Sequence, residues 1–217
     1  MIDLHTHSLL SDGDLLPTEL ARRAEIKGYK VIGITDHVDA SNIEFVIDNV
    51  SKACKEINKH WSIKAIPGVE ITHVPPKTIK DTVKFARSKG IKLILVHGET
   101  PVECVVPGTN KMALLAGVDI LVHPGLITLE DTKLAASKGI YLEITARKGH
   151  SLANGHVAKV ARKAGAKLVI NTDTHTPDNL ITKDFASTVL YGAGIEKKEA
   201  EVVFKNSKDL ACKVLEG

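Results

Sequence analysis

Aromatic residues and paired cysteines are both scarce in this sequence. Phe, Trp and Tyr make up only 4% of the 217 residues, so Val, Ile, Leu and Ala must fill the core, which favours a parallel α/β core over a β-sandwich. The three cysteines, Cys54, Cys104 and Cys212, form no CxxC pair and no even-numbered set. We therefore expect reduced thiols in a cytoplasmic protein rather than a disulfide framework.

Strong charge and long apolar runs are also missing. The formal net charge is +3, which gives no strong case for a nucleic acid or an acidic membrane surface as partner. The chain opens MIDLHTH, which is a strand pattern rather than a signal peptide, and no membrane span is visible. We expect no membrane partner, and the sequence predicts no oligomeric state.

The 43% of apolar residues form short β-rich runs that alternate with longer helical patterns. The predicted strands are Ile2–Leu4, Val31–Thr35, Lys64–Ile71, Lys92–Val96, Ile120–Val122, Tyr141–Ile144 and Leu168–Asn171. The predicted helices are approximately Pro17–Lys27, Ile43–Lys59, Pro76–Lys89, Asn110–Ala116, Leu129–Lys138, Leu152–Ala164, Leu180–Tyr191 and Glu196–Leu215. Seven βα units predict a single-domain α/β fold that closes as a TIM-like barrel, and an open doubly wound sheet is the alternative.

Eight of the ten histidines lie just after or near the end of a predicted strand, and carboxylates accompany them. The carboxyl ends of parallel strands form one rim, so these side chains should converge there. One such histidine is usually a partly buried residue with a backbone partner. Repetition on six strands is hard to explain in that way, because imidazoles beside buried carboxylates are costly without a compensating ion. Imidazole and carboxylate are the ligands of Zn, Mn and Fe sites.

Two short spacings strengthen the prediction of a metal site. His5 and His7 are two residues apart at a strand end, so both side chains point to the same side. Asp173 and His175 repeat this arrangement on the last strand. In a closed barrel the first and last strands are neighbours, and the two pairs would face each other.

These motifs, taken in order, resemble the PHP (polymerase and histidinol phosphatase) superfamily. The resemblance runs from His5 to about Gly194, and its ordered set is His5-Thr6-His7, Ser11-Asp12-Gly13, Thr35-Asp36-His37, Gly68-Val69-Glu70, His97, His123-Pro124-Gly125 and Asp173-Thr174-His175. It implies a distorted (β/α)7 barrel over residues 1–217, with 196–217 as a C-terminal helical tail.

The resemblance also implies two to three divalent ions, Zn, Mn or Fe, with Mg as an alternative. The first ion would take His5, His7, Glu70 and Asp173, and the second would share Glu70 and add His97 and His123. The third would take Asp12, His37 and His175, although many members have histidine where this chain has Asp12. Metal-bound hydroxide would then attack phosphorus while the ions offset the charge. Glu70, Asp173 and Arg147 are the expected catalytic residues.

Further candidates lie beside these ligands. Arg147, Lys148 and His150 follow the sixth strand and are candidate substrate-binding residues, because a guanidinium and a glycine-opened loop suit a phosphate; a structural role is the alternative for each. His73 and Glu99 could orient ligand imidazoles or contact substrate. Structural roles are preferred for His156 and for the N-cap segment Gly108-Thr109-Asn110, and His60 is expected on the surface. Asp36 is expected to orient an imidazole, and Glu143 could point into the barrel.

Three functions remain open at this stage. The leading one is a metal-dependent phosphomonoesterase acting on a small metabolite of the histidinol phosphate or nucleotide type. The second is a nuclease or 3′-end processing phosphoesterase on single-stranded nucleic acid, which is a less favoured partner. The third is a non-catalytic RNA-binding barrel, like a subunit of archaeal ribonuclease P. That third function predicts lost ligands and a basic face, whereas here every ligand position is filled.

Overall fold

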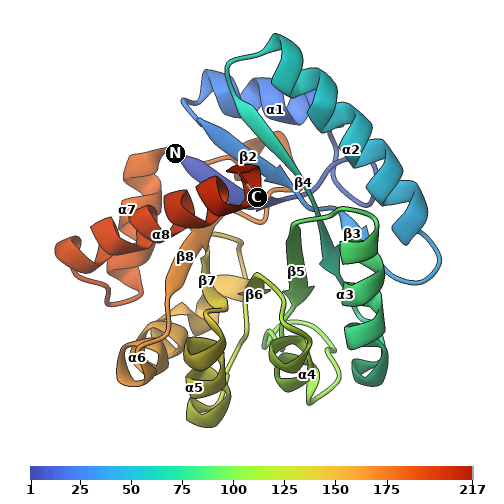
Figure 1. The fold of residues 1–217 in the computed structure, drawn as a ribbon. Helices are drawn as coiled ribbons and strands as arrows, with labels where there is room; N and C mark the ends of the chain where they lie inside the picture. The colour runs from blue at the N-terminus through green and yellow to red at the C-terminus, as the bar shows by residue number, and fades with distance from the viewer. Residues whose placement is uncertain (217) are drawn as a thin grey trace.

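Seven parallel strands form a nearly closed barrel with helices around it (Figure 1). The computed structural model describes residues 1–216, so only residue 217 of the expected tail lies outside the described part. Around the barrel the strands are β1 (Ile2–Thr6), β2 (Val31–Ile34), β4 (Lys64–Ile71), β5 (Leu93–His97), β6 (Ile120–Val122), β7 (Tyr141–Thr145) and β8 (Leu168–Asn171). A two-residue strand that the sequence did not predict, β3 (His37–Val38), pairs with β4.

The barrel closes between its first and last strands. Thr6 and Thr174 form a parallel bridge, the backbone N–H of His7 donates to the Thr174 carbonyl at 2.8 Å, and that of Asp173 donates to the His5 carbonyl at 3.0 Å. The predicted TIM-like barrel is therefore confirmed, and the open doubly wound sheet is wrong. The closure also brings the pair His5 and His7 on the first strand beside the pair Asp173 and His175 after the last strand.

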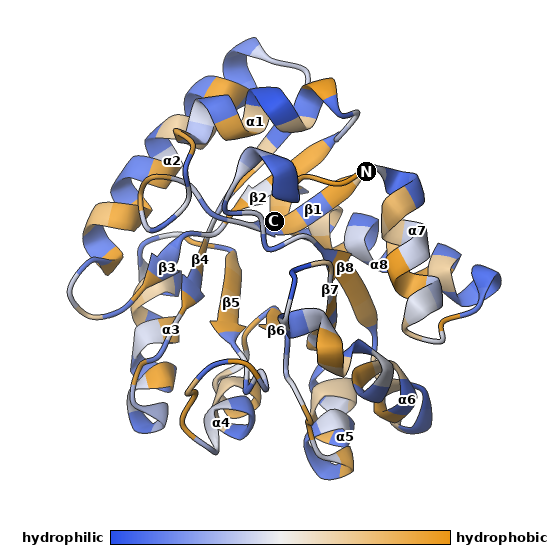
Figure 2. Cartoon of the chain, turned by 180° about the vertical axis from the view of Figure 1, so that it is seen from behind, coloured by the Kyte–Doolittle hydropathy of each residue, from blue (hydrophilic) through white to orange (hydrophobic). Residues whose placement is uncertain are grey.

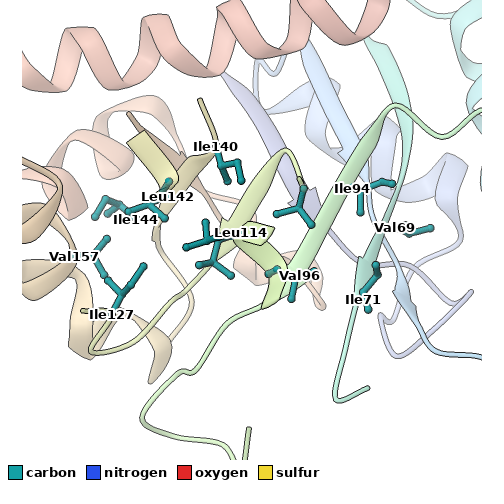
Figure 3. Close-up of a cluster of buried hydrophobic side chains, with 14 of the residues drawn as sticks. Val69, Ile71, Ile94, Val96, Leu114, Ile127, Ile140, Leu142, Ile144 and Val157 are labelled. Atoms are coloured by element: carbon teal, nitrogen blue, oxygen red, sulfur yellow. The ribbon is translucent and has the colours of Figure 1, made fainter. Parts of the chain in front are cut away.

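Helices cover the outside of the barrel, and their apolar faces pack on the strands. They are α1 (Pro17–Ile26), α2 (Ile43–His60), α3 (Ile79–Ser88), α4 (Thr109–Ala116), α5 (Leu129–Lys138), α6 (Asn154–Ala164) and α7 (Lys183–Gly192). Figure 3 shows part of this layer, in which Val69, Ile94 and Leu142 from strands and Leu114 and Val157 from helices belong to one buried cluster. Hydropathy follows the same division, with apolar strands inside and polar outer helix faces (Figure 2).

The last helix, α8 (Lys197–Glu216), covers the amino-terminal end of the barrel. Its Leu210, Ala211 and Val214 are buried in one cluster with strand residues that include Leu4 and Leu93. Because this end is closed by apolar packing, the polar side chains of the barrel gather at the opposite, carboxyl end. Among the described residues, none of the helices combines the length and the apolar character needed to cross a membrane.

Most predicted boundaries agree with the structure to within two residues, and the differences have local causes. The helix expected from Leu180 begins at Lys183, because the Thr182 side chain accepts a hydrogen bond from the Phe185 N–H and so caps the helix there. The helices expected from Pro76 and Leu152 begin instead as 3₁₀ turns, Pro76–Thr78 and His150–Ala153, before the α-helices continue.

Candidate metal centre

The nine predicted ligands lie in one connected cluster at the carboxyl rim. Every barrel strand except β7 has a predicted ligand at or shortly after its carboxyl end, because a parallel barrel directs all its carboxyl ends to one side. Groups whose donor atoms lie within 4.8 Å of one another link every predicted ligand. The residues are His5, His7, Asp12, His37, Glu70, His97, His123, Asp173 and His175.

The innermost group consists of two imidazoles and two carboxylates. His5 Nε2 lies 3.1 Å from Glu70 Oε2 and 3.7 Å from Asp173 Oδ1, and His7 Nε2 lies 3.3 Å from each of these oxygens. Donors about 2.0–2.2 Å from a tetrahedral ion stand roughly 3.3–3.6 Å apart, so these spacings suit one shared cation. All four side chains are at most 3% exposed.

Several buried polar atoms here have no hydrogen-bond partner among the described residues. They are His7 Nδ1 and Nε2, Glu70 Oε1, His123 Nδ1 and Asp173 Oδ1. Each unsatisfied buried group costs about 1–3 kcal/mol, and more when it is charged. Every one of these atoms belongs to a predicted ligand residue, so bound cations would offset much of the cost. The residues present therefore fit a metal centre.

The outermost group gathers around Asp12. Its carboxylate lies 3.6 Å from His37 Nε2 and 3.3 Å from His175 Nε2, and its side chain is 57% exposed. The His7 ring stacks on both of these imidazoles, with centroid distances of 4.2 Å to His37 and 4.1 Å to His175. An aspartate at this position therefore still faces both imidazoles and can serve as an oxygen ligand.

The remaining group consists of His97, His123 and His150. His123 Nε2 lies 3.6 Å from Glu70 Oε1, which makes Glu70 the residue common to this group and the innermost one. His150 stacks on His123 at 4.3 Å, and all three imidazoles are less than 9% exposed. His150, which was predicted to bind substrate, therefore lies directly against two of the predicted metal ligands.

Glu143 orients the innermost group from inside the barrel. Its Oε1 lies 2.8 Å from His5 Nδ1 and accepts from Asn171 Nδ2 at 2.9 Å, while Oε2 accepts from the His123 backbone N–H at 3.0 Å. A proton on His5 Nδ1 leaves Nε2 free to face Glu70 and Asp173. The inward orientation that the sequence left open is therefore the observed one, and Glu143 acts through His5.

Burial and close charges move several pKa values in this cluster. Burial lowers the pKa of His7 well below its usual value, and His37 adds to the effect, so His7 is neutral near pH 7. Burial likewise lowers the pKa of His150 to about 3, with His123 adding to it. Burial alone would raise the pKa of Glu70, but the charges of His5 and His37 outweigh it and hold that pKa well below normal. His7 and His150 are thus already in the neutral form that metal binding requires. Burial alone would lower the pKa of His5, but Glu143 and Glu70 outweigh it and hold that pKa well above normal, so an ion binding there would displace a proton from His5.

The backbone at the site is strained at three positions. Asp173, His123 and His73 have φ angles of 54°, 28° and 51°, in the left-handed region that side-chain-bearing residues rarely adopt. Such conformations cost about 1–3 kcal/mol each and persist where surrounding contacts impose them. Two of the three are predicted ligands, and the third, His73, borders the same cavity.

A cavity of about 320 Å³ opens over the cluster. Asp12, His97, His150, Asp173 and Arg147 are among the residues lining it. The Arg147 guanidinium donates to Asn179 Oδ1 at 3.1 Å and to the Asp173 carbonyl at 3.4 Å, so it is braced beside the last strand. Lys148 is exposed and is not among the lining residues.

Several secondary candidates have roles that differ from the predicted ones. Glu99 caps α4, because its Oε1 accepts from the backbone N–H groups of Gly108 and Asn110 at 3.0 and 2.9 Å. Asp36 accepts from Ser8 and Ser11 and so fixes the loop after β1 instead of an imidazole.

The remaining histidines behave as the sequence suggested. His156 Nε2 contacts the Ile127 carbonyl oxygen at 2.8 Å, which is the expected structural role. The His60 side chain is 58% exposed.

Sequence reasoning missed Glu103. This residue lies in the loop between β5 and α4, and its carboxylate contacts His73, His97 and His150. The only sequence signal was an acidic residue in the longest rim loop, which specifies no contact by itself.

Comparison with known proteins gives the following similarities. Residues 3–122 match the model of the family described as PHP domain. A protein of Methanocaldococcus jannaschii, described as uncharacterized, is 47% identical over 201 residues, 92% of each chain. The DNA polymerase/3′-5′ exonuclease PolX of Bacillus subtilis is 26% identical over 198 residues, 82% of this chain and 35% of its own. A probable phosphatase of Thermoanaerobacter sp. is 27% identical over 222 residues, 90% of this chain and 87% of its own.

Among solved structures, the fold resembles a chain in the cryo-EM structure of archaeal ribonuclease P with mature tRNA. The TM-score is 0.76 at 19% identity, covering 99% of this chain and 91% of the other. At that identity the likeness concerns the fold.

Proposed function

The chain belongs to the PHP domain family, and on that basis we propose that it is a metal-dependent phosphoesterase that hydrolyses small phosphomonoesters. The observation that carries the proposal is the set of buried, unpartnered donor atoms on His7, Glu70, His123 and Asp173, gathered where a cation would satisfy them. The family match and the similarity to a probable phosphatase support the same reaction class.

In this proposal nine side chains hold two to three divalent ions, of which Zn, Mn and Fe suit the mixed imidazole and carboxylate donors and Mg is an alternative. Bound there, such ions would polarise phosphoryl oxygens and lower the pKa of water. Glu70 and Asp173 contribute the central carboxylates, and Glu143 holds His5 with Nε2 directed at them. These residues prearrange the site, so little rearrangement is needed when substrate binds.

Arg147 is proposed to bind the phosphoryl group. Its guanidinium is a fork of donors that matches phosphate oxygens, and it is braced at the cavity wall by Asn179 and the Asp173 carbonyl. His150 lines the same cavity and is proposed to contact substrate or a ligand of the metal centre. The exposed ammonium of Lys148 is proposed to bind any part of the substrate that extends out of the cavity.

The cavity favours a small substrate over a nucleic acid strand. About 320 Å³ suits a metabolite of the histidinol phosphate or nucleotide type. Among the described lining residues, Arg147 is the sole lysine or arginine, and no Phe, Tyr or Trp offers a surface on which bases could stack. A nuclease acting on single strands is the second candidate, and similarity to an exonuclease-containing polymerase is the observation that favours it. The filled ligand set argues against a purely RNA-binding role.

A substrate panel tests the proposal. p-Nitrophenyl phosphate, phosphorylated metabolites, nucleotides and single-stranded oligonucleotides are each incubated with protein loaded with Mn²⁺, Zn²⁺ or Mg²⁺. We expect phosphate release from small monoesters, and loss of that activity in Asp173→Ala. Turnover of oligonucleotides alone would favour the nuclease, and a fully active Asp173→Ala variant would refute the assigned role of this carboxylate.

A further inference from the structure

Glu103 places a carboxylate over the metal centre from a loop that belongs to none of the family motifs. Its Oε2 lies 3.1 Å from His97 Nε2 and 3.2 Å from His73 Nε2, and its Oε1 lies 3.3 Å from His150 Nε2. The Glu103 side chain is 39% exposed, so it lies at the mouth of the cavity and lines it. A partly exposed carboxylate could instead point into water, so its position against three imidazoles indicates a favourable interaction there.

The loop that carries Glu103 is braced at both ends. Glu99, at the start of the loop, accepts hydrogen bonds from the backbone N–H groups of Gly108 and Asn110 at its end. These bonds link the two ends of residues 99–110. Next to Glu99, Thr100 Oγ1 lies 2.7 Å from His150 Nδ1. Gly125 of the neighbouring loop packs so closely that a Cβ there would collide with the Glu99 carbonyl oxygen. These contacts hold the start of the loop against the site and direct Glu103 inward.

His73 contacts the Glu103 carboxylate through its Nε2 atom. Its left-handed backbone, with φ of 51°, directs the imidazole toward the carboxylate and toward the His97 ring, 5.0 Å away between centroids. His150 is fixed through its Nδ1 by Thr100, so its Nε2 is the atom that faces Glu103. The two histidines therefore hold the two carboxylate oxygens in a defined orientation.

The His97 ring presents its Nε2 atom to the Glu103 carboxylate. His97 Nδ1 lies 3.2 Å from the Gly98 carbonyl oxygen, and a carbonyl can only accept, so Nδ1 carries the proton. On a neutral ring Nε2 then presents a lone pair to the carboxylate. Nε2 is therefore the ring atom that can bind a cation, and it is the atom that faces Glu103. A separation of 3.1 Å is also close to the spacing of two ligands on one ion.

We propose that Glu103 is a ligand of the metal ion bound by His97, supplied by the loop between β5 and α4, and that His73 and His150 position its carboxylate. This inference rests on the metal centre of the proposed function. It adds an anionic oxygen ligand to the Glu70, His97 and His123 set and makes that ion the one whose binding depends on the loop. Imidazoles with two carboxylates suit Zn, Mn, Fe or Co rather than Ca.

Metal affinity tests the assignment without relying on turnover. Metal-free protein is titrated with Mn²⁺ and Zn²⁺ by calorimetry, and bound ions are counted by native mass spectrometry. The variants are Glu103→Gln, Glu103→Asp and His73→Gln, and Glu201→Gln removes an exposed carboxylate on α8 as the matched control. We expect Glu103→Gln to weaken one ion by at least about 10- to 100-fold and to leave the others unchanged. The aspartate variant should recover part of this affinity, His73→Gln should lose less than Glu103→Gln, and the control should match the wild type.

The neighbouring thiol provides a second measurement. Cys104 is exposed and adjacent to Glu103, whereas Cys54 is buried, so in a Cys212→Ser background maleimide labelling reports on this loop. Mn²⁺ should slow labelling of the otherwise native chain and leave the rate in Glu103→Gln unchanged. Equal slowing of labelling in the otherwise native chain and in Glu103→Gln would show that the Glu103 carboxylate does not couple this loop to the ion.

The outcomes separate this inference from the proposed function. Unchanged affinity for every ion in Glu103→Gln, in a protein that hydrolyses phosphomonoesters, would overturn the inference alone. Loss of one ion in Glu103→Gln, in a protein that hydrolyses no phosphoester, would support the inference and refute the proposed function. A wild-type protein that binds no ion would overturn both.

Discussion

His5 Nδ1 and Glu143 Oε1 lie 2.8 Å apart inside the barrel, although 138 residues separate them in the chain. Both side chains are fully buried, and Glu143 also binds Asn171 and the His123 backbone. One carboxylate thus sets the orientation of one predicted ligand side chain and the backbone of another. The proposed metal centre would therefore depend on Glu143, although this residue is not among the predicted ligands.

Replacing Glu143 by Gln should weaken metal binding by about 10- to 100-fold, because outer partners of ligand histidines typically contribute that much. The amide would place a donor against either the His123 N–H or the Asn171 amide, so the melting temperature should also fall. Metal content after dialysis and thermal unfolding measure the two effects, with the exposed Glu130→Gln as control. Wild-type metal content in the Glu143 variant would contradict the orienting role.

Replacing Arg147 by Ala should mainly raise KM for a phosphomonoester. Loss of a charged hydrogen bond of about 1.5–3 kcal/mol corresponds to roughly a 10- to 100-fold change. Arg147→Lys should recover only part of the affinity, since an ammonium lacks the planar fork of donors. Steady-state kinetics measure this effect, and Arg162→Ala is the control. Arg162 pairs with Glu199 and does not line this cavity, so its loss should leave KM unchanged. An unchanged KM would mean that Arg147 only braces the last strand.

Removing bound metal should inactivate the protein and lower its melting temperature. An ion present at about 100 times its dissociation constant stabilises the folded state by about 2.7 kcal/mol, which corresponds to roughly 5–10 °C for a chain of this size. Dialysis against a chelator followed by calorimetry measures the shift, and adding back Mn²⁺, Zn²⁺ or Mg²⁺ should restore it. Protein purified without any ion, yet fully active, would exclude the metal centre.

Glu25 should make stability depend on pH away from the site. Its Oε1 accepts from the Ser62 hydroxyl at 2.6 Å and from the Ser62 and Ile63 backbone N–H groups, and Ser62 and Arg22 lower its pKa to about 2. A depressed pKa stabilises the folded state above the ordinary value of about 4.5 and loses this effect as the pH falls toward 2. Glu25→Gln should therefore melt below the wild type at pH 7, with the gap narrowing at pH 3. A gap independent of pH would show that the charge is irrelevant.

The spacing of residues along strands was enough to predict much of the site. Side chains alternate along a strand, so His5 and His7 had to share a side, and parallel strands had to deliver Glu70, His97 and His123 to the same rim. These inferences depend only on strand periodicity and on the direction of the carboxyl ends. The fold class followed similarly from seven alternating βα units and was confirmed by the bridge between Thr6 and Thr174.

Periodicity could not decide the orientation of residues in strands buried on both sides. Glu143 lies within an entirely buried strand, and its neighbours in sequence are apolar on either side. Only the curvature of the closed barrel determines that it faces His5 rather than a helix. The Leu180 region was similarly ambiguous, because an apolar residue suits both a helix start and a core loop.

The sequence by itself determined the barrel, its rim and the residues gathered there, because strand periodicity and alternation are local properties. Tertiary structure alone decided what the loops contribute. Glu99 caps a helix and Glu103 faces His97, although both are acidic residues of the same loop. The difference arises from contacts with other loops. Thr100, which lies between the two glutamates, contacts His150 after β7, and Gly125 after β6 packs against Glu99. Such contacts have no periodicity, so only the folded chain reveals them.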